Sequence, residues 1–182
     1  MNDFIFHNPD KVYFGRNQLT HLSEELLKFG NKVLLVYGGG SIKKNGLYDS
    51  IKEIAKKDGI ELFELSGVEP NPRHSTVNRG AEICKRENIS IVLAAGGGST
   101  IDCAKGIAAA ALTEKGDVWQ LVSNDVWVTE ALPVVANLMW ASSMALNSIL
   151  DGGTVHGCAC HAMEHELSAY YDITHGHGAL QS

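Results

Sequence analysis

The sequence predicts an α/β fold, and two of its features lead to that class. Short apolar runs alternate along the chain with segments whose apolar residues follow helical spacing. An apolar run also leads twice into the same Gly-Gly-Gly-Ser turn, at residues 38–41 and 96–99. Glycine-bounded apolar runs are typical of parallel strands that are covered on both faces. We therefore expect a Rossmann-like parallel sheet flanked by helices, followed by a remnant of an all-helical domain.

The expected elements of the sheet domain follow one another in a regular order. Asn17 is placed to cap a helix that runs to Gly30. Pro70 and Pro72 constrain their neighbours, so residues 68–72 should form a rigid loop, at the edge of the sheet that faces a ligand. The other predicted elements are strands at 33–37, 60–65 and 90–95 and helices at 47–57, 76–88 and 100–112.

The last third of the chain has a different character. From Met139 the residues favour helix, with a break at 151–153 and a second helix at 160–171. Five of the eight histidines fall here, namely His156, His161, His165, His175 and His177. We expect two domains, an α/β domain at 1–137 that binds a dinucleotide and an incomplete helical domain at 138–182 that binds a metal.

Composition and charge exclude several classes of function. A net charge of −6 works against sequence-independent binding of nucleic acid, which needs lysine and arginine to displace phosphate counterions. No apolar run approaches the ~20 residues of a membrane span, and the first residues do not resemble a signal peptide. We therefore expect a cytoplasmic protein that contacts no membrane. Its four cysteines should be reduced thiols.

The second glycine turn has the features of a pyrophosphate site. Gly96, Gly97 and Gly98 would let a pyrophosphate approach the backbone closely. Ser99 is placed to cap the helix that follows, while Asp102 can reach back to the backbone as in a capping box. Lys105 shares a helix face with Asp102 and would bring positive charge near phosphate or ribose oxygens. The alternative is a capped helix with an incidental ion pair.

The first glycine turn bears on the choice of nucleotide. Gly38, Gly39, Gly40 and Ser41 are followed by two lysines, Lys43 and Lys44, where an NAD-specific site more often has an acidic side chain. A small hydroxyl with nearby lysines favours a 2′-phosphate and hence NADPH over NADH. The alternative is a flexible loop with solvated lysines.

The histidines suggest a metal. His161 and His165 are four residues apart and so project from one face of a helix, and His175 follows after a turn. Neutral imidazoles in this arrangement suit a divalent transition metal. Cys158 and Cys160 offer a rival, a structural zinc site with cysteine and histidine ligands, although their spacing fits no standard zinc finger.

Taken together, these motifs are similar to a known family. The chain resembles the iron-containing, or group III, alcohol dehydrogenases, in particular their NADPH-dependent branch of butanol dehydrogenases and aldehyde reductases. The resemblance covers nearly the whole chain and rests on residues 8–15, 37–41, 67–72, 96–105 and 161–178.

The resemblance implies a two-domain oxidoreductase that interconverts alcohols and aldehydes or ketones and forms a homodimer. NADPH or NADH would lie in the cleft, and Fe²⁺ or Zn²⁺ would polarise the substrate oxygen. By position in the motif, His161 and His175 match metal ligands and His165 matches a histidine suited to proton relay. Residues 38–41 match the adenosine-ribose site and 96–99 the pyrophosphate turn, with Asn71 of the proline-containing loop also at the cofactor.

The chain also departs from the family pattern. The resemblance implies an internal deletion near 136–138 and a C-terminus truncated at Ser182, which together remove an aspartate and a histidine ligand of the metal. Asp3 and His7 have the spacing of that pair but lie about 13 Å apart in an extended segment. Two histidines alone should bind a metal weakly, so we expect impaired catalysis. The alternatives are a non-catalytic NADPH-binding module and a histidine-rich metal-binding or interaction protein.

Overall fold

The computed structural model describes residues 11–113, 117–123 and 130–136. These residues contain a four-stranded parallel sheet with the strand order β2-β1-β3-β4, which confirms the predicted α/β class. The strands are β1 (Lys32–Tyr37), β2 (Glu61–Leu65), β3 (Ile91–Ala95) and β4 (Val134–Ala136). The expected helical domain at 138–182 lies outside the described residues, and the domain boundary stays a prediction.

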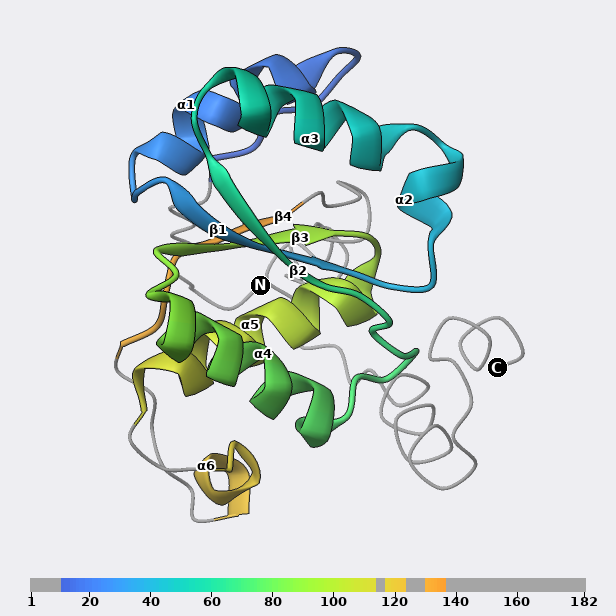
Figure 1. Cartoon of the computed structure of the whole chain (residues 1–182). Coiled ribbons are helices and arrows are strands. Elements are labelled where there is room, and N and C mark those ends of the chain that lie inside the picture. Colours follow the sequence, from blue (N-terminus) through green and yellow to red (C-terminus); the bar gives the residue numbers. More distant parts are fainter. Residues whose placement is uncertain (1–10, 114–116, 124–129, 137–182) are drawn as a thin grey trace, which may run out of the picture. The chain divides into compact units, whose positions relative to one another are not determined.

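Helices cover both faces of the sheet (Figure 1). On one face, α1 (Leu22–Leu27) and α3 (Leu47–Lys57) pack against Val33, Leu35 and Tyr37 of β1. On the other face, α4 (His74–Glu87) and α5 (Gly98–Leu112) pack against Leu34 and Val36 of the same strand. This alternation follows from the two-residue period of a strand, and it explains why β1 is buried on both faces.

The two helices on the second face cross closely because glycines lie at the crossing. A Cβ atom added at Gly80 of α4 would lie 2.4 Å from Cδ1 of Ile107, a fully buried side chain of α5. One added at Gly106 of α5 would lie 3.2 Å from Cγ1 of Val77 of α4. The close approach of α4 and α5 therefore depends on glycine, which has no Cβ atom, at positions 80 and 106.

The start of the chain's first helix differs from the prediction. Asn17 has a left-handed backbone, with φ of 61°, and its side chain makes no capping hydrogen bond. Its carbonyl oxygen instead accepts hydrogen bonds from the backbone N–H and the hydroxyl of Thr20 in a 3₁₀ turn, η1 (Gln18–His21), that precedes α1. A capping residue needs an extended backbone, so the predicted cap is wrong. Only Leu22 and Leu26 of α1 are buried.

Three further elements have no counterpart in the sequence predictions, the short helices α2 (Ser41–Lys44) and α6 (Trp119–Ser123) and the short strand β4. Asp117, just before α6, accepts a hydrogen bond from the side-chain amide of Asn78 of α4 at 2.8 Å. The Asn78 side-chain oxygen in turn accepts one from the backbone N–H of Val118 at 2.8 Å. The segment that contains α6 is therefore attached to α4 by paired polar contacts.

The sequence predicts reduced cysteines and no membrane-spanning helix. Cys84 and Cys103 are buried and free, which confirms reduced thiols at these positions, while the other two cysteines lie outside the described residues. Within the described ranges, no helix has the length and apolar character that crossing a membrane requires.

Candidate functional site

The two glycine turns lie next to each other at the carboxyl edge of the sheet. Tyr37 and Ala95 are paired in the register of β1 and β3, so Gly38 and Gly96 leave the two strands at the same level. A Cβ atom added at Gly38 would lie 4.0 Å from Oγ1 of Thr100, and one added at Gly96 would lie 2.5 Å from the same atom. Thr100 therefore sits between the two turns.

Thr100 is a residue that the sequence reasoning missed. Its side chain is buried in the first turn of α5, with 6% of the residue exposed. The available signal was its position directly after the second Gly-Gly-Gly-Ser motif. Any side chain at Gly96 would collide with Thr100, so the fold itself requires glycine at this position.

Other glycines of the turns face open space. A Cβ atom added at Gly39, Gly40, Gly97 or Gly98 would meet no other atom within 4 Å. Gly40 also has a φ of 110°, which other residues adopt only with strain. These four positions leave the backbone accessible along the edge where the two turns meet, as a phosphate-binding surface requires.

The start of α5 corrects the predicted capping box. The helix begins at Gly98 with Gly97 as its N-terminal cap, and no side chain makes a capping hydrogen bond. The carbonyl oxygen of Gly97 accepts hydrogen bonds from the backbone N–H groups of Thr100 and Ile101, so the helix starts before Ser99. The predicted cap by Ser99 and Asp102 is wrong for this reason.

The Ser99 hydroxyl makes a different contact. It accepts a hydrogen bond of 3.4 Å from the backbone N–H of Asn71. Asn71 has a left-handed backbone, with φ of 55°, in the loop between the two prolines. The structure thus brings the proline-containing loop, which follows β2, beside the second glycine turn.

The first turn of α5 presents unpaired backbone donors. The first N–H groups of a helix have no partner within it, and the helix dipole adds partial positive charge at that end. Gly98 lies at this end and is exposed. Asp102 and Lys105 are also exposed, and in the described part of the chain no ion pair joins them. This end of α5 can therefore receive an anion, and the incidental ion pair is not formed.

The helices that follow β1 and β3 lie on opposite faces of the sheet. The connection after β1 leads to α3 on one face, whereas the connection after β3 leads to α5 on the opposite face (Figure 1). Adjacent parallel strands whose helices leave in this way form a topological switch point, where open α/β sheets bind their ligands.

A cluster of aromatic and charged side chains lies beside the first turn. The hydroxyl of Tyr37 donates a hydrogen bond of 2.8 Å to Oε2 of Glu64, and the hydroxyl of Tyr48 donates one of 2.8 Å to Oε1. Lys43 Nζ lies 5.3 Å from the ring centroid of Tyr37 and 4.8 Å from that of Tyr48. Lys52 Nζ lies 3.9 Å from Glu64 Oε1. We call Tyr37, Glu64 and Tyr48 the tyrosine-glutamate cluster.

The surroundings of this cluster keep Glu64 and Lys43 charged and Tyr37 neutral. Partial burial works to raise the pKa of Glu64, but the hydrogen bonds from the two tyrosines and the nearby lysine charges outweigh it and lower that pKa. Burial and the Glu64 hydrogen bond raise the pKa of Tyr37. Hydrogen bonding to Tyr37 raises the pKa of Lys43. Glu64 is therefore a carboxylate and Lys43 an ammonium at neutral pH.

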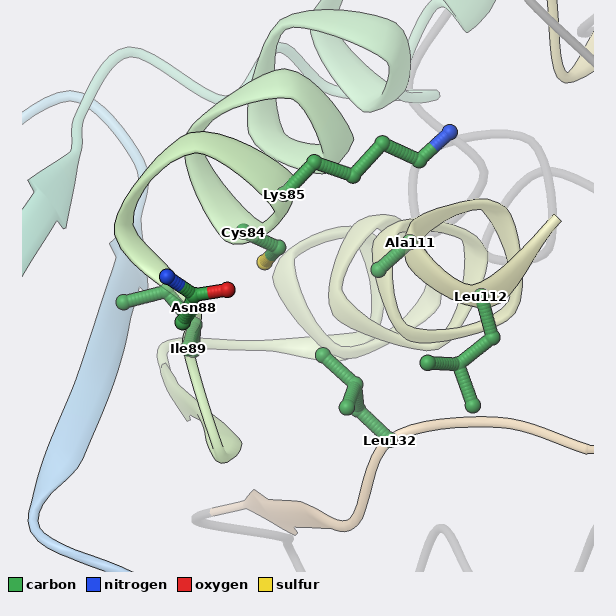
Figure 2. A pocket seen from close by; sticks show the side chains of 7 residues that line it. All are labelled: Cys84, Lys85, Asn88, Ile89, Ala111, Leu112 and Leu132. Carbon is green, nitrogen blue, oxygen red and sulfur yellow. The ribbon is translucent and has the colours of Figure 1, made fainter. Parts of the chain in front are cut away.

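A separate hollow of about 250 Å³ lies at the opposite edge of the sheet. Figure 2 shows Cys84, Lys85 and Asn88 on one side of it and Ala111, Leu112 and Leu132 on the other. Burial raises the pKa of the Cys84 thiol to about 12, so this cysteine is not a nucleophile at neutral pH. Residues 88–89 precede β3, whereas the glycine turns follow the strands, so the hollow does not belong to the site at the turns.

The predicted metal site is not among the described residues. Within 11–113, 117–123 and 130–136, no group of three or more histidine, cysteine or acidic side chains could hold a metal ion. His161, His165 and His175 lie outside these ranges, and so do Cys158 and Cys160 of the rival zinc site. Both metal sites stay predictions.

Glycine turns at the switch point of a parallel sheet are typical of α/β proteins that bind nucleotides. Comparison with known proteins gives the family. The family model for iron-containing alcohol dehydrogenase matches residues 9–143, so the chain belongs to that family. The resemblance found in the sequence is confirmed.

Two curated relatives and one solved structure illustrate the match. An NADH-dependent butanol dehydrogenase A of Clostridium acetobutylicum is 33% identical, over 98% of this chain and 73% of the relative. An NADPH-dependent aldehyde reductase of Escherichia coli is 37% identical, over 67% of this chain and 31% of the relative. The crystal structure of an NADH-dependent butanol dehydrogenase A from Thermotoga maritima superposes with a TM-score of 0.89 and 30% identity, over 98% of this chain and 72% of that one.

The match with the Clostridium relative has an internal gap. It extends over 285 residues, whereas this chain has 182 residues, so more than a hundred residues of the relative have no counterpart here. The number of unmatched residues is compatible with the predicted internal deletion, whose position near 136–138 stays a prediction.

Proposed function

We propose that this chain binds NADPH or NADH across the two glycine turns. The observation that supports this most is the pair of turns at adjacent strand ends, with Thr100 between them and open space at Gly39, Gly40, Gly97 and Gly98. In this proposal the pyrophosphate lies on the second turn at the start of α5, and the adenosine ribose lies on the first turn. The names of the relatives, which include both nucleotides, support the same cofactor class.

The side chains around the turns have separate roles in the proposal. Ser41 and Ser99 stand at the ends of the two glycine motifs, and Asn71 is held against Ser99. Lys105, on the exposed face of α5, adds positive charge, with Asp102 on the same face for hydroxyl groups of the ribose. The glycines and lysines of the first turn favour NADPH.

We further propose that this chain catalyses the reaction of the family, at a lowered rate. That reaction is the interconversion of an alcohol and an aldehyde or ketone, with hydride exchanged with the nicotinamide. His161 and His175 would hold Fe²⁺ or Zn²⁺, which when bound polarises the substrate oxygen, and His165 would relay a proton. Two imidazoles are one ligand fewer than an open catalytic site usually has, so we propose weak metal binding and impaired turnover.

A second candidate is a nucleotide-binding module without catalysis. The internal gap against the Clostridium relative favours it, because the gap removes more than a hundred residues and leaves the glycine turns intact. The two candidates agree on the nucleotide and differ only in the chemistry that follows.

Nucleotide binding and turnover can be measured on the same preparation. We expect the fluorescence of NADPH and NADH to increase on binding. Reduction of butanal with added Fe²⁺ or Zn²⁺ should fall at least about 100-fold below that of the Clostridium relative, because the loss of metal ligands should cost at least as much as the loss of a residue that only supports a ligand. Turnover comparable with the relative would contradict the impairment. No binding at millimolar nucleotide would contradict both candidates. Residual activity that His161→Ala removes, with nucleotide binding unchanged, would favour the enzyme over the module.

A further inference from the structure

The tyrosine-glutamate cluster lies directly against the first glycine turn. Tyr37 is the last residue of β1 and precedes Gly38. The segment that leaves β2 is hydrogen bonded to these same residues, because Gly67 N donates to the Gly38 carbonyl at 3.3 Å and Val68 N to the Tyr37 carbonyl at 3.2 Å. Glu64, near the end of β2, is therefore at the edge where the adenosine ribose is proposed to bind.

The hydrogen bonds within the cluster decide what its hydroxyls can offer a ligand. A tyrosine hydroxyl has one proton, and both tyrosines donate theirs to Glu64. The hydroxyl of the half-buried Tyr48 can then only accept toward a ligand. Tyr37 is buried, with 3% of the residue exposed, so its hydroxyl offers a ligand no proton either. A ribose 2′-hydroxyl can donate to such an oxygen, whereas a 2′-phosphate, which is an acceptor at neutral pH, is repelled by it.

The charges of the cluster act in the same direction. Lys43 is one of the two lysines, with Lys44, that the sequence assigned to a 2′-phosphate, but its ammonium lies over the rings of Tyr37 and Tyr48. The hydroxyls of both tyrosines are hydrogen bonded to the carboxylate of Glu64, a side chain that is 33% exposed. Lys52 also lies 3.9 Å from Glu64, so the single negative charge of Glu64 partly offsets the two ammonium groups, Lys43 and Lys52, that this region would present to a phosphate.

We propose that Glu64 is a specificity-determining residue, which limits the preference of the first turn for the 2′-phosphate of NADPH over the 2′-hydroxyl of NADH. This inference rests on the proposed nucleotide site. Glu64 acts through the orientation of two hydroxyl protons and through its own charge. The glycines and lysines of the turn allow NADPH to bind, and Glu64 keeps the affinity for NADH comparable with the affinity for NADPH.

The substitution Glu64→Gln tests this directly. Glutamine keeps the size of the side chain and one acceptor, but removes the charge and supplies an N–H donor, which allows one tyrosine hydroxyl to turn its proton outward. The ratio of NADPH to NADH affinity, measured by fluorescence titration at low salt, should rise about three- to tenfold. The matched control is Glu61→Gln, an exposed glutamate at the other end of β2, for which the ratio should not change.

Lys43→Met supplies an independent test at an exposed position that does not threaten folding. In the unmodified chain it should lower the NADPH affinity less than about twofold, because Glu64 already partly offsets the charge, and in the Glu64→Gln chain it should lower that affinity more. A large loss in the unmodified chain would overturn the proposal even if Glu64→Gln fails to fold.

The outcomes separate the inference from the proposed function. If both nucleotides bind and Glu64→Gln leaves their ratio unchanged or moves it toward NADH, Glu64 does not set the preference, and the nucleotide site stands. An equal shift in Glu61→Gln would show a general effect of net charge and would also overturn the proposal. If neither nucleotide binds the unmodified chain, the proposed function fails and the inference fails with it.

Discussion

Gly98→Asp is expected to weaken NADPH binding about 100-fold without weakening the fold. The aspartate would place a negative charge at the start of α5, where two pyrophosphate charges are proposed to lie at about 5 Å, and repulsion at that distance accounts for a loss of this size. A Cβ atom added at Gly98 would meet no other atom of the described chain within 4 Å, so the described fold leaves space at this position. An acidic residue in the first turn of a helix is itself stabilising by about 0.5 kcal/mol.

The control for this prediction is Gly98→Asn, which has nearly the same shape and no charge. Its dissociation constant for NADPH should stay within about tenfold of that of the unmodified chain, since only space and not charge is changed. Thermal unfolding of both variants checks that the fold is retained. An asparagine variant that loses as much affinity as the aspartate variant would show that space, rather than charge, matters at this position. Unchanged NADPH affinity in both variants would show that the second turn is not part of the nucleotide site.

Gly80→Leu should have the largest effect on stability. Even a single added carbon at Gly80 would lie 2.4 Å from the buried Ile107 side chain, so a leucine must force α4 and α5 apart. Overpacking of this kind costs about 3 kcal/mol. Urea denaturation should show the change as a lower midpoint.

The matched control is Glu82→Leu, which adds the same side chain on the exposed face of the same helix. Its free energy of unfolding should stay within about 0.5 kcal/mol of the unmodified value. Equal losses in the two variants would mean that leucine disturbs α4 wherever it is placed. No loss at Gly80 would show that the crossing of α4 and α5 does not require a glycine.

The sheet could be predicted because its signals are local in the sequence. Residues 33–37 and 91–95 are uninterrupted apolar runs that end in glycine, and the structure buries all of them. The helix at 47–57 likewise shows its buried face through spacing alone. The strand at 134–136 has only three residues and was missed, because so short a run gives no period to recognise.

The helix starts could not be predicted because tertiary contacts decide them. Ser99 has the residue type and position of a cap, yet its hydroxyl is taken by the backbone of Asn71 from a distant loop. Asn17 also has a capping side chain, but its left-handed backbone removes it from the capping geometry. In both places the local pattern was correct for an isolated helix and was overridden by the surrounding chain.

The candidate site was predicted in part. The sequence identified both glycine turns, and the structure brings them together through a strand register that a single sequence does not reveal. It assigned Lys43 to a phosphate but not Glu64, which lies 27 residues from Tyr37 and meets it only in the folded sheet. The one available signal was that Glu64 shares a strand face with the apolar Leu62, where a charged residue requires partners.

Glycine-selective NMR tests most directly whether the two turns form one dinucleotide site. The chain has 19 glycines, so a ¹⁵N-glycine sample gives 19 amide signals, with those of Gly39 and Gly97 assigned from single alanine variants. Titration with NADPH to about 1 mM should shift both signals together with one dissociation constant, while Gly59, at the opposite edge of the sheet, stays unchanged. No shift at either turn, or a shift at one turn alone, would contradict a site that extends across both.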